Sequence, residues 1–126
     1  MSSEDGVRRA MEPPALRIET RTEGDSIFIV LAGELDASSC PAVEAKLADA
    51  DGDGDGLVVV DLREVNFIDS TGIALLVRAM RASAEDSDRL RVVPSRSRDV
   101  QRLLEICGMD QALPILEDPA GDEELR

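Results

Sequence analysis

An apolar segment joined to a helix by Asp-Ser-Thr-Gly is the feature that most constrains how this 126-residue chain can fold. Residues 58–62 begin with three valines, and such a run is typical of a strand buried on both faces of a sheet. A polar turn then leads to residues 69–72, after which apolar side chains recur with helical spacing at Ile73, Leu76, Val77 and Met80. We therefore predict a strand over residues 57–62 and a helix over residues 70–83.

Ser70 falls at the junction of this strand and helix, either as the N-cap or as a residue of the first helical turn. In both positions its hydroxyl is expected to be exposed beside the positive end of the helix dipole and several unpaired backbone N–H groups, which is a favourable environment for a phosphate. Asp69 would then place a carboxylate beside the modified group. The residues alone do not separate a serine that only caps the helix from one that is phosphorylated, and Thr71 is a neighbouring candidate.

The remaining pattern predicts one α/β domain over residues 14–118, between a disordered leader at 1–13 and an acidic tail at 119–126. Helices between the later strands imply a mixed, mostly parallel sheet of four to five strands with an antiparallel N-terminal hairpin, packed against three or so helices. The further strands are expected over residues 16–21, 27–32, 90–93 and, as a short last strand, 113–116. The further helices are expected from about Ser39, with Val43, Leu47 and Ala50 facing inward, and over residues 99–107, followed by Gly108 as the C′ residue.

A formal net charge of −13 and the lack of long apolar segments limit the classes of partner. The charge argues against nucleic acid, because binding phosphates requires clustered Lys and Arg, and equally against an anionic membrane surface. No apolar run approaches the length of a bilayer span, and the first residues lack the apolar core of a signal peptide. We expect a cytoplasmic protein.

The chain contains no histidine and two cysteines, which limits its possible chemistry. Without histidine, neither a Ser-His-Asp nor a Cys-His hydrolase can form, so Ser70 is not expected to be a triad nucleophile. Zinc would have to be held by cysteine and carboxylate alone. We expect Cys40 to be half-buried at a helix start and Cys107 to lie in the core near a helix end, without a disulfide. Neither enzymatic activity nor a cofactor is expected.

Two groups of carboxylates invite a metal-binding interpretation. Residues 49–56 are rich in Asp and Gly, but a calcium loop starting at Asp51 would have Leu62 where its bidentate glutamate belongs, so a solvated acidic loop is preferred. Asp36 and Asp69 each follow a predicted parallel strand, which would bring them to the same end of the sheet. An acid–base or Mg²⁺ pair is conceivable there, but no third ligand is evident. We interpret the two carboxylates as part of a recognition surface, with no metal site.

Two motifs resemble those of a known family. Residues 67–73, Phe-Ile-Asp-Ser-Thr-Gly-Ile, resemble the signature loop of the STAS domain, specifically that of bacterial anti-sigma-factor antagonists. Upstream, residues 31–36 read Leu-Ala-Gly-Glu-Leu-Asp and resemble the family's strand-end motif. The order and spacing of the other elements agree as well, so the resemblance covers residues 14–118.

The resemblance implies an anti-anti-sigma factor. Its unphosphorylated form would bind an anti-sigma factor that is itself a Ser/Thr kinase, and would so release a sigma factor. Phosphorylation of Ser70, the family's modified position, would reverse this, and a metal-dependent phosphatase would reset it. The alternative is a STAS scaffold or regulatory module of a signalling complex without a sigma factor. The implied partner-binding residues are Gly33, Glu34, Asp36, Asp69, Ser70, Thr71 and Gly72, the last expected to leave room for the partner.

Overall fold

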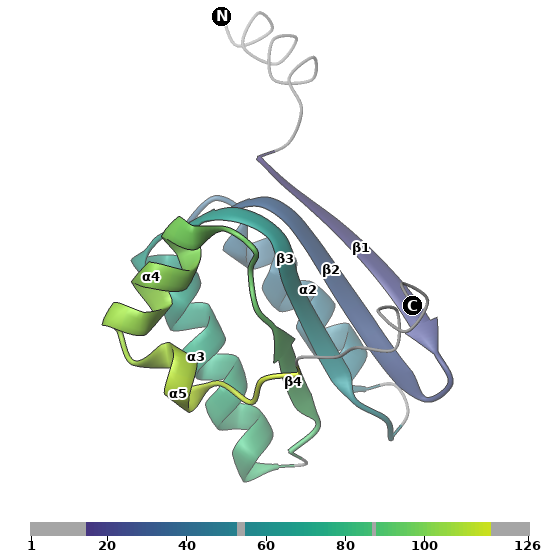
Figure 1. Ribbon diagram of the computed structural model, residues 1–126. Coiled ribbons are helices and arrows are strands. Elements are labelled where there is room, and N and C mark those ends of the chain that lie inside the picture. Colours follow the sequence, from purple (N-terminus) through teal and green to yellow (C-terminus); the bar gives the residue numbers. More distant parts are fainter. Residues whose placement is uncertain (1–14, 53–54, 87, 117–126) are drawn as a thin grey trace, which may run out of the picture.

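A computed structural model describes residues 15–52, 55–86 and 88–116, which form a four-stranded sheet and its covering helices (Figure 1). The expected leader over residues 1–13 and the expected tail over 119–126 lie outside the described residues. The limits of the domain at 14 and 118 therefore stay a prediction.

The sheet has the order β1-β2-β3-β4 and combines one antiparallel pair with two parallel pairs. β1 (Leu16–Glu23) turns at Gly24 into β2 (Ser26–Leu35), which pairs with it antiparallel. β3 (Val58–Ile68) runs parallel to β2, and β4 (Leu90–Val93) runs parallel to β3. The predicted mixed, mostly parallel sheet with an N-terminal hairpin is confirmed.

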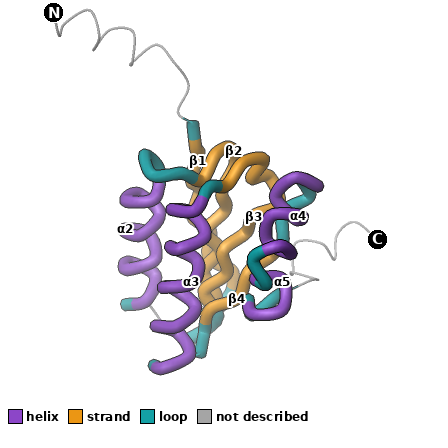
Figure 2. The backbone as a smooth tube through the Cα atoms, turned by 90° about the vertical axis from the view of Figure 1, so that its left-hand side faces the viewer, coloured by secondary structure: helices purple, strands orange, loops and turns teal. Residues whose placement is uncertain are grey.

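The helices enclose the core from one face and one edge of the sheet. α2 (Cys40–Asp51) and α3 (Ser70–Glu85) lie side by side against the face, and α4 (Arg98–Ile106) and α5 (Met109–Ala112) lie at the β4 edge (Figure 2). In the described part of the chain, none of these helices is long and apolar enough to cross a membrane. The core between helices and sheet is aliphatic, and its fully buried side chains include Ile29, Leu31, Leu35, Val43, Val60, Leu62, Val65, Leu75, Leu76 and Val100.

The other face of the sheet carries a smaller apolar cluster, in which Phe28, Val59 and Val93 are buried. Arg21 on β1 places its guanidinium carbon 5.6 Å from the centroid of the Phe28 ring, a distance at which a cation–π contact forms. Alternate residues of the valine run therefore face opposite sides of the sheet, with Val60 in the main core and Val59 in this second cluster. Burial on both faces explains why the start of β3 is continuously apolar.

β3 is longer than predicted, because residues 63–66, expected to form a polar turn, continue the strand. Its pairing with β2 shifts register between Asp61 and Glu64 and again between Val65 and Phe67, and each shift inserts one extra residue into β3. Such bulges increase the local twist and bend the strand. They also place the buried side chains of Leu62, Val65 and Ile68 three residues apart rather than two, so the strand does not show the usual alternation.

The C-terminal part differs from the prediction at two points. α4 ends at Ile106, and Gly108, with a φ of 76°, turns the chain so that Met109 becomes buried in the core. Cys107 is consequently exposed, and the prediction that it lies in the core is wrong. The expected last strand is reduced to a single parallel bridge between Ile115 and Val92.

Candidate functional site

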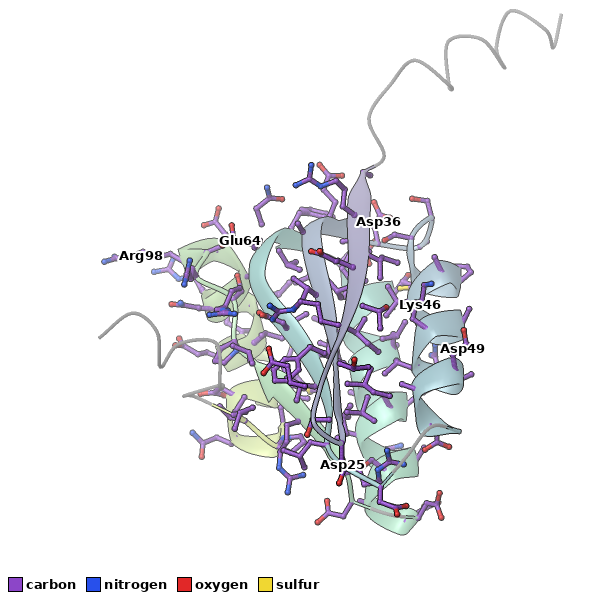
Figure 3. The ribbon with its side chains drawn as sticks, turned by 90° about the vertical axis from the view of Figure 1, so that its right-hand side faces the viewer. Asp25, Asp36, Lys46, Asp49, Glu64 and Arg98 are labelled. Atoms are coloured by element: carbon purple, nitrogen blue, oxygen red, sulfur yellow. The ribbon has the colours of Figure 1, made fainter. Side chains whose placement is uncertain are left out.

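The candidate site lies at the end of the sheet where β2 and β3 stop side by side. Their last residues, Leu35 and Ile68, are paired in register, so Asp36 and Asp69 follow at neighbouring positions. The backbone N–H of Asp69 donates to the carbonyl oxygen of Leu35 at 3.3 Å. The prediction that both aspartates lie at one end of the sheet is confirmed, and Figure 3 shows Asp36 at the end opposite Asp25 of the hairpin.

Asp69, and not Ser70, is the N-cap of α3. Its backbone is extended, with φ −115° and ψ −173°, and its Oδ1 accepts a hydrogen bond from the N–H of Gly72 at 3.0 Å. Ser70 is therefore the first residue of the helix, which is one of the two positions that the sequence allowed. Ser70 is exposed, and its side chain forms no hydrogen bond with any other described residue. Its hydroxyl is thus accessible and is not needed to hold the helix end.

Asp36 organises the loop between β2 and α2. Its Oδ1 accepts hydrogen bonds from the hydroxyl and the backbone N–H of Ser38, at 2.7 and 3.1 Å, and from the N–H of Ser39 at 3.3 Å. The hydrogen bond from the Ser38 hydroxyl is the main reason that the pKa of the Asp36 carboxyl is lowered, so this group is charged at neutral pH. The Ser39 hydroxyl donates to the carbonyl oxygen of Glu34 at 3.0 Å. The loop conformation thus holds a carboxylate at the strand end.

Gly33 and Glu34 lie in β2, beside the residue that precedes β1. Gly33 has a φ of 120°, a backbone conformation that favours glycine, and a Cβ there would collide with the carbonyl oxygen of Ala15. The same carbonyl accepts a hydrogen bond from the N–H of Glu34 at 2.8 Å. Gly33 is therefore required by the approach of the two backbones, whereas Glu34 leaves an exposed carboxylate beside Asp36.

Gly72 faces the interior, which corrects the reason expected for a glycine at this position. It is buried, and a Cβ on it would lie 2.6 Å from the carbonyl oxygen of Leu35 and 2.7 Å from Cγ1 of Ile68. These atoms belong to the ends of β2 and β3, so the missing side chain lets α3 begin directly against the sheet. It does not clear space for a partner. The neighbouring Thr71 is half-buried.

Cys40 is the first residue of α2 and is buried at the same end of the sheet. Burial raises the pKa of its thiol, and the nearby carboxylates of Asp69, Glu44 and Asp36 raise it further. The thiol is therefore protonated at neutral pH and is a poor nucleophile. Cys40 acts as a small apolar packing residue, more deeply buried than predicted.

The acidic groups singled out from the sequence are separated by the fold. Asp49 and Asp51 belong to the last turn of α2, Asp53 lies outside the described residues, and β3 begins at Val58. Among the residues that the structure describes, no group of three or more Cys, Asp or Glu side chains could hold a metal ion. The carboxylates of Asp36 and Asp69 accept hydrogen bonds from their own loop and helix.

Two exposed apolar residues near the site were not identified from the sequence. Phe67 in β3 is 46% exposed and Ile106 at the end of α4 is 74% exposed. The exposure of Phe67 follows from the second bulge of β3, which no local pattern reveals. Ile106 does carry a signal, because it falls outside the helical spacing of Val100, Leu103 and Leu104.

These features define a regulatory binding domain: an exposed serine and an acidic loop are presented at the strand ends of a small α/β sheet. The chain belongs to the STAS-domain family of anti-sigma-factor antagonists. The family profile described as "Mlab, STAS domain" matches residues 18–117. The anti-sigma-B factor antagonist of Staphylococcus aureus is 31% identical over 102 residues, which are 81% of this chain and 94% of that protein.

Solved structures show the same fold. An anti-sigma-factor antagonist from Mycobacterium paratuberculosis superimposes with a TM-score of 0.69 at 24% identity, covering 90% of this chain and 94% of that one. The Bacillus cell fate determinant SpoIIAA, in its phosphorylated form, superimposes with a TM-score of 0.61 at 18% identity, covering 87% of this chain and 100% of that one. The family and the fold class expected from the sequence are confirmed.

Replacing Asp69 by Ala should lower the free energy of unfolding by about 0.5–2 kcal/mol, because α3 loses its N-cap. Asp69→Asn keeps an oxygen that can accept from Gly72, and should differ from the wild type by less than about 0.5 kcal/mol. Urea unfolding followed by circular dichroism measures both. Ser70→Ala is the control and should also lie within about 0.5 kcal/mol; a loss matching that of Asp69→Ala would show that Ser70 caps the helix after all.

Replacing Gly72 by Ala should lower the free energy of unfolding by about 1–3 kcal/mol, because the new methyl group overlaps atoms of Leu35 and Ile68. The matched control is Gly52→Ala at the end of α2, where the nearest atom to a new Cβ is the carbonyl oxygen of Asp49 at 3.8 Å. That variant should change stability by less than about 0.5 kcal/mol. Equal unfolding midpoints for the two variants would contradict the close approach of α3 to the sheet.

Proposed function

We propose that this chain is a phosphorylation-controlled anti-sigma-factor antagonist. Unphosphorylated, it binds an anti-sigma factor that is a Ser/Thr kinase, and the sigma factor is released. The kinase then phosphorylates Ser70, the complex dissociates, and a metal-dependent Ser/Thr phosphatase restores the active form. The observation that carries this proposal is the exposed Ser70 at the start of α3, whose hydroxyl has no structural task because Asp69 caps the helix.

A phosphate on Ser70 is compatible with the fold. It adds about −1.5 to −2 charges at neutral pH. At the N-terminus of a helix, a negative charge is favoured by roughly 0.3–1 kcal/mol, so α3 should persist. The phosphate does not displace the cap, because the cap hydrogen bond runs from Gly72 to the Asp69 carboxylate. The modification should therefore act locally.

The same phosphate is unfavourable inside an interface. Its charge would have to be desolvated close to the carboxylate of Asp69 and on the same end of the sheet as Asp36 and Glu34. Burying an uncompensated charge beside like charges should lower the binding free energy of the complex by several kcal/mol, because the charge loses its water and is repelled by its neighbours. We therefore expect the phosphorylated protein to keep its fold and to lose its affinity for the partner.

The partner-binding face in this proposal combines the residues that the family resemblance implies. Glu34, Asp36 and Ser70 offer side chains to the partner, and Thr71 offers part of its surface. Asp69 contributes the charge and the cap. Gly33 contributes through its backbone conformation, and Gly72 contributes because its missing side chain lets α3 begin against the sheet. The names of the relatives support the proposal, since the Staphylococcus aureus protein is an anti-sigma-B factor antagonist and SpoIIAA exists in a phosphorylated form.

The test compares Ser70→Ala with Ser70→Asp against the kinase anti-sigma factor of the same organism. Because Ser70 is not the cap, both variants should unfold within about 0.5 kcal/mol of the wild type, so stability does not confound the result. Ser70→Ala should bind like the unphosphorylated wild type and remain unmodified after incubation with ATP. Ser70→Asp should bind at least about tenfold more weakly, a change of about 1.4 kcal/mol, in isothermal titration calorimetry.

Mass spectrometry of the wild type after incubation with the kinase and ATP locates the phosphate, with Thr71→Ala as the matched control. We expect one phosphate on Ser70 in both proteins. A phosphate on Thr71 with Ser70 unmodified would refute the assignment of the site. A wild-type protein that neither binds an anti-sigma factor nor is phosphorylated, and that purifies in a large assembly, would support the scaffold function instead.

A further inference from the structure

The two most exposed large apolar side chains of the described residues lie on one groove. Phe67, 46% exposed, comes from the end of β3, and Ile106, 74% exposed, comes from the end of α4. The groove between them has a volume of 370 Å³. Its remaining lining consists of three apolar residues, Ile68, Val100 and Leu103, and three polar or charged ones, Asn66, Asp99 and Arg102.

The backbone holds both apolar residues at the surface. The second bulge of β3 leaves Asn66 without a partner in β2, so the strand turns and Phe67 is directed outward while Ile68 is buried. On the other side, the turn at Gly108 ends α4 and keeps Ile106 on its last turn, away from the buried Val100 and Leu104. A groove built on a strand and a helix is pre-organised, which limits the ordering entropy of binding.

The rim of the groove favours a negatively charged partner. Arg98 and Arg102 lie one turn apart on α4, and neither forms an ion pair with a described residue, whereas the adjacent Arg96 is paired with Glu64 at 3.2 Å. Arg98 extends away from the domain into solvent in Figure 3. Asp99 also reaches the groove, where it lies in the first turn of α4 and interacts favourably with the helix dipole.

The groove lies close along the chain to the proposed phosphorylation site. Ile68 lines the groove, and Ser70 follows two residues later at the start of α3. Phe67 precedes Ser70 by three residues, so a partner that reaches Ser70 needs to extend only a short way to cover Phe67. An exposed apolar patch beside polar groups is the usual character of the central part of a protein–protein interface.

We infer that the Phe67–Ile106 groove is the apolar anchor of the partner-binding face, and that it takes an apolar side chain of the kinase anti-sigma factor flanked by carboxylates that pair with Arg98 and Arg102. The inference rests on the proposed function. The groove then supplies binding affinity in the unphosphorylated state, and phosphorylation of the nearby Ser70 ends binding. Loss of the groove should then weaken docking without slowing phosphate transfer in the docked complex.

The test uses the full chain with the purified kinase anti-sigma factor in isothermal titration calorimetry and in phosphorylation kinetics at saturating ATP. Ile106→Ser and Phe67→Ser should each raise the Kd and the KM for phosphorylation about tenfold, with kcat within about twofold, because a few side chains buried at the centre of an interface carry most of its binding energy. Ile106→Ser alters a side chain that is 74% exposed, so its melting temperature should equal that of the wild type. This variant keeps the result interpretable where Phe67→Ser is destabilised.

The charge component is tested by Arg102→Glu, with Arg81→Glu as the matched control, since Arg81 is also exposed and lies on the distant part of α3. Arg102→Glu should weaken binding and Arg81→Glu should not. Equal losses in the two variants would mean that net charge alone acts, and would overturn the pairing.

If the wild type binds and is phosphorylated while Ile106→Ser and Phe67→Ser match it, the groove inference fails and the proposed function stands. If the wild type is not bound at all, the proposed function itself fails.

Discussion

The junction of β2, β3 and α3 is the contact on which the rest of the site depends. The N–H of Asp69 bonds to the carbonyl of Leu35, the Asp69 carboxylate bonds to the N–H of Gly72, and Gly72 has no side chain to hold α3 away from Leu35. Two hydrogen bonds and one close packing contact thus fix the first turn of the helix against the paired strand ends. The exposed position of Ser70 and its nearness to Asp36 both follow from this arrangement.

Most of the fold could be predicted from the sequence because its periodicities are local. Alternation in β1, the continuous apolar run of β2 and β3, and the helical spacing after Gly72 each depend only on which face of an element is buried. The continuation of β3 past Leu62 could not be predicted, since two bulges change the spacing of its buried residues from two to three. The exposure of Cys107 depends on where Gly108 redirects the chain. The helical spacing of apolar residues in α4 therefore led to the wrong prediction that Cys107 is buried.

The sequence predicted which residues meet at the strand ends, but not which of them caps the helix or which glycine faces inward. The motif places Asp69, Ser70 and Gly72 together, yet whether Asp69 or Ser70 caps the helix depends on the backbone of a single residue. Likewise, an inward-facing and an outward-facing glycine look the same in a sequence, and only the position of Leu35 shows that Gly72 faces inward. The Phe67–Ile106 groove joins residues about forty positions apart, and its detection required the packing of α4 beside β3.

The division of tasks between neighbours has a physical consequence for switching. If Ser70 capped α3, a phosphate would have to compete with the cap, and modification would alter stability and binding together. With Asp69 as the cap, a phosphate on Ser70 would break no hydrogen bond within the fold, so its effect would fall on a bound partner. That effect is directional, because Glu34, Asp36 and Asp69 make one side of the site acidic while Arg98 and Arg102 lie on α4 on the other. In the proposed switch, a phosphate on Ser70 would enlarge the acidic side, where it would oppose the partner, and would leave the proposed apolar anchor unchanged.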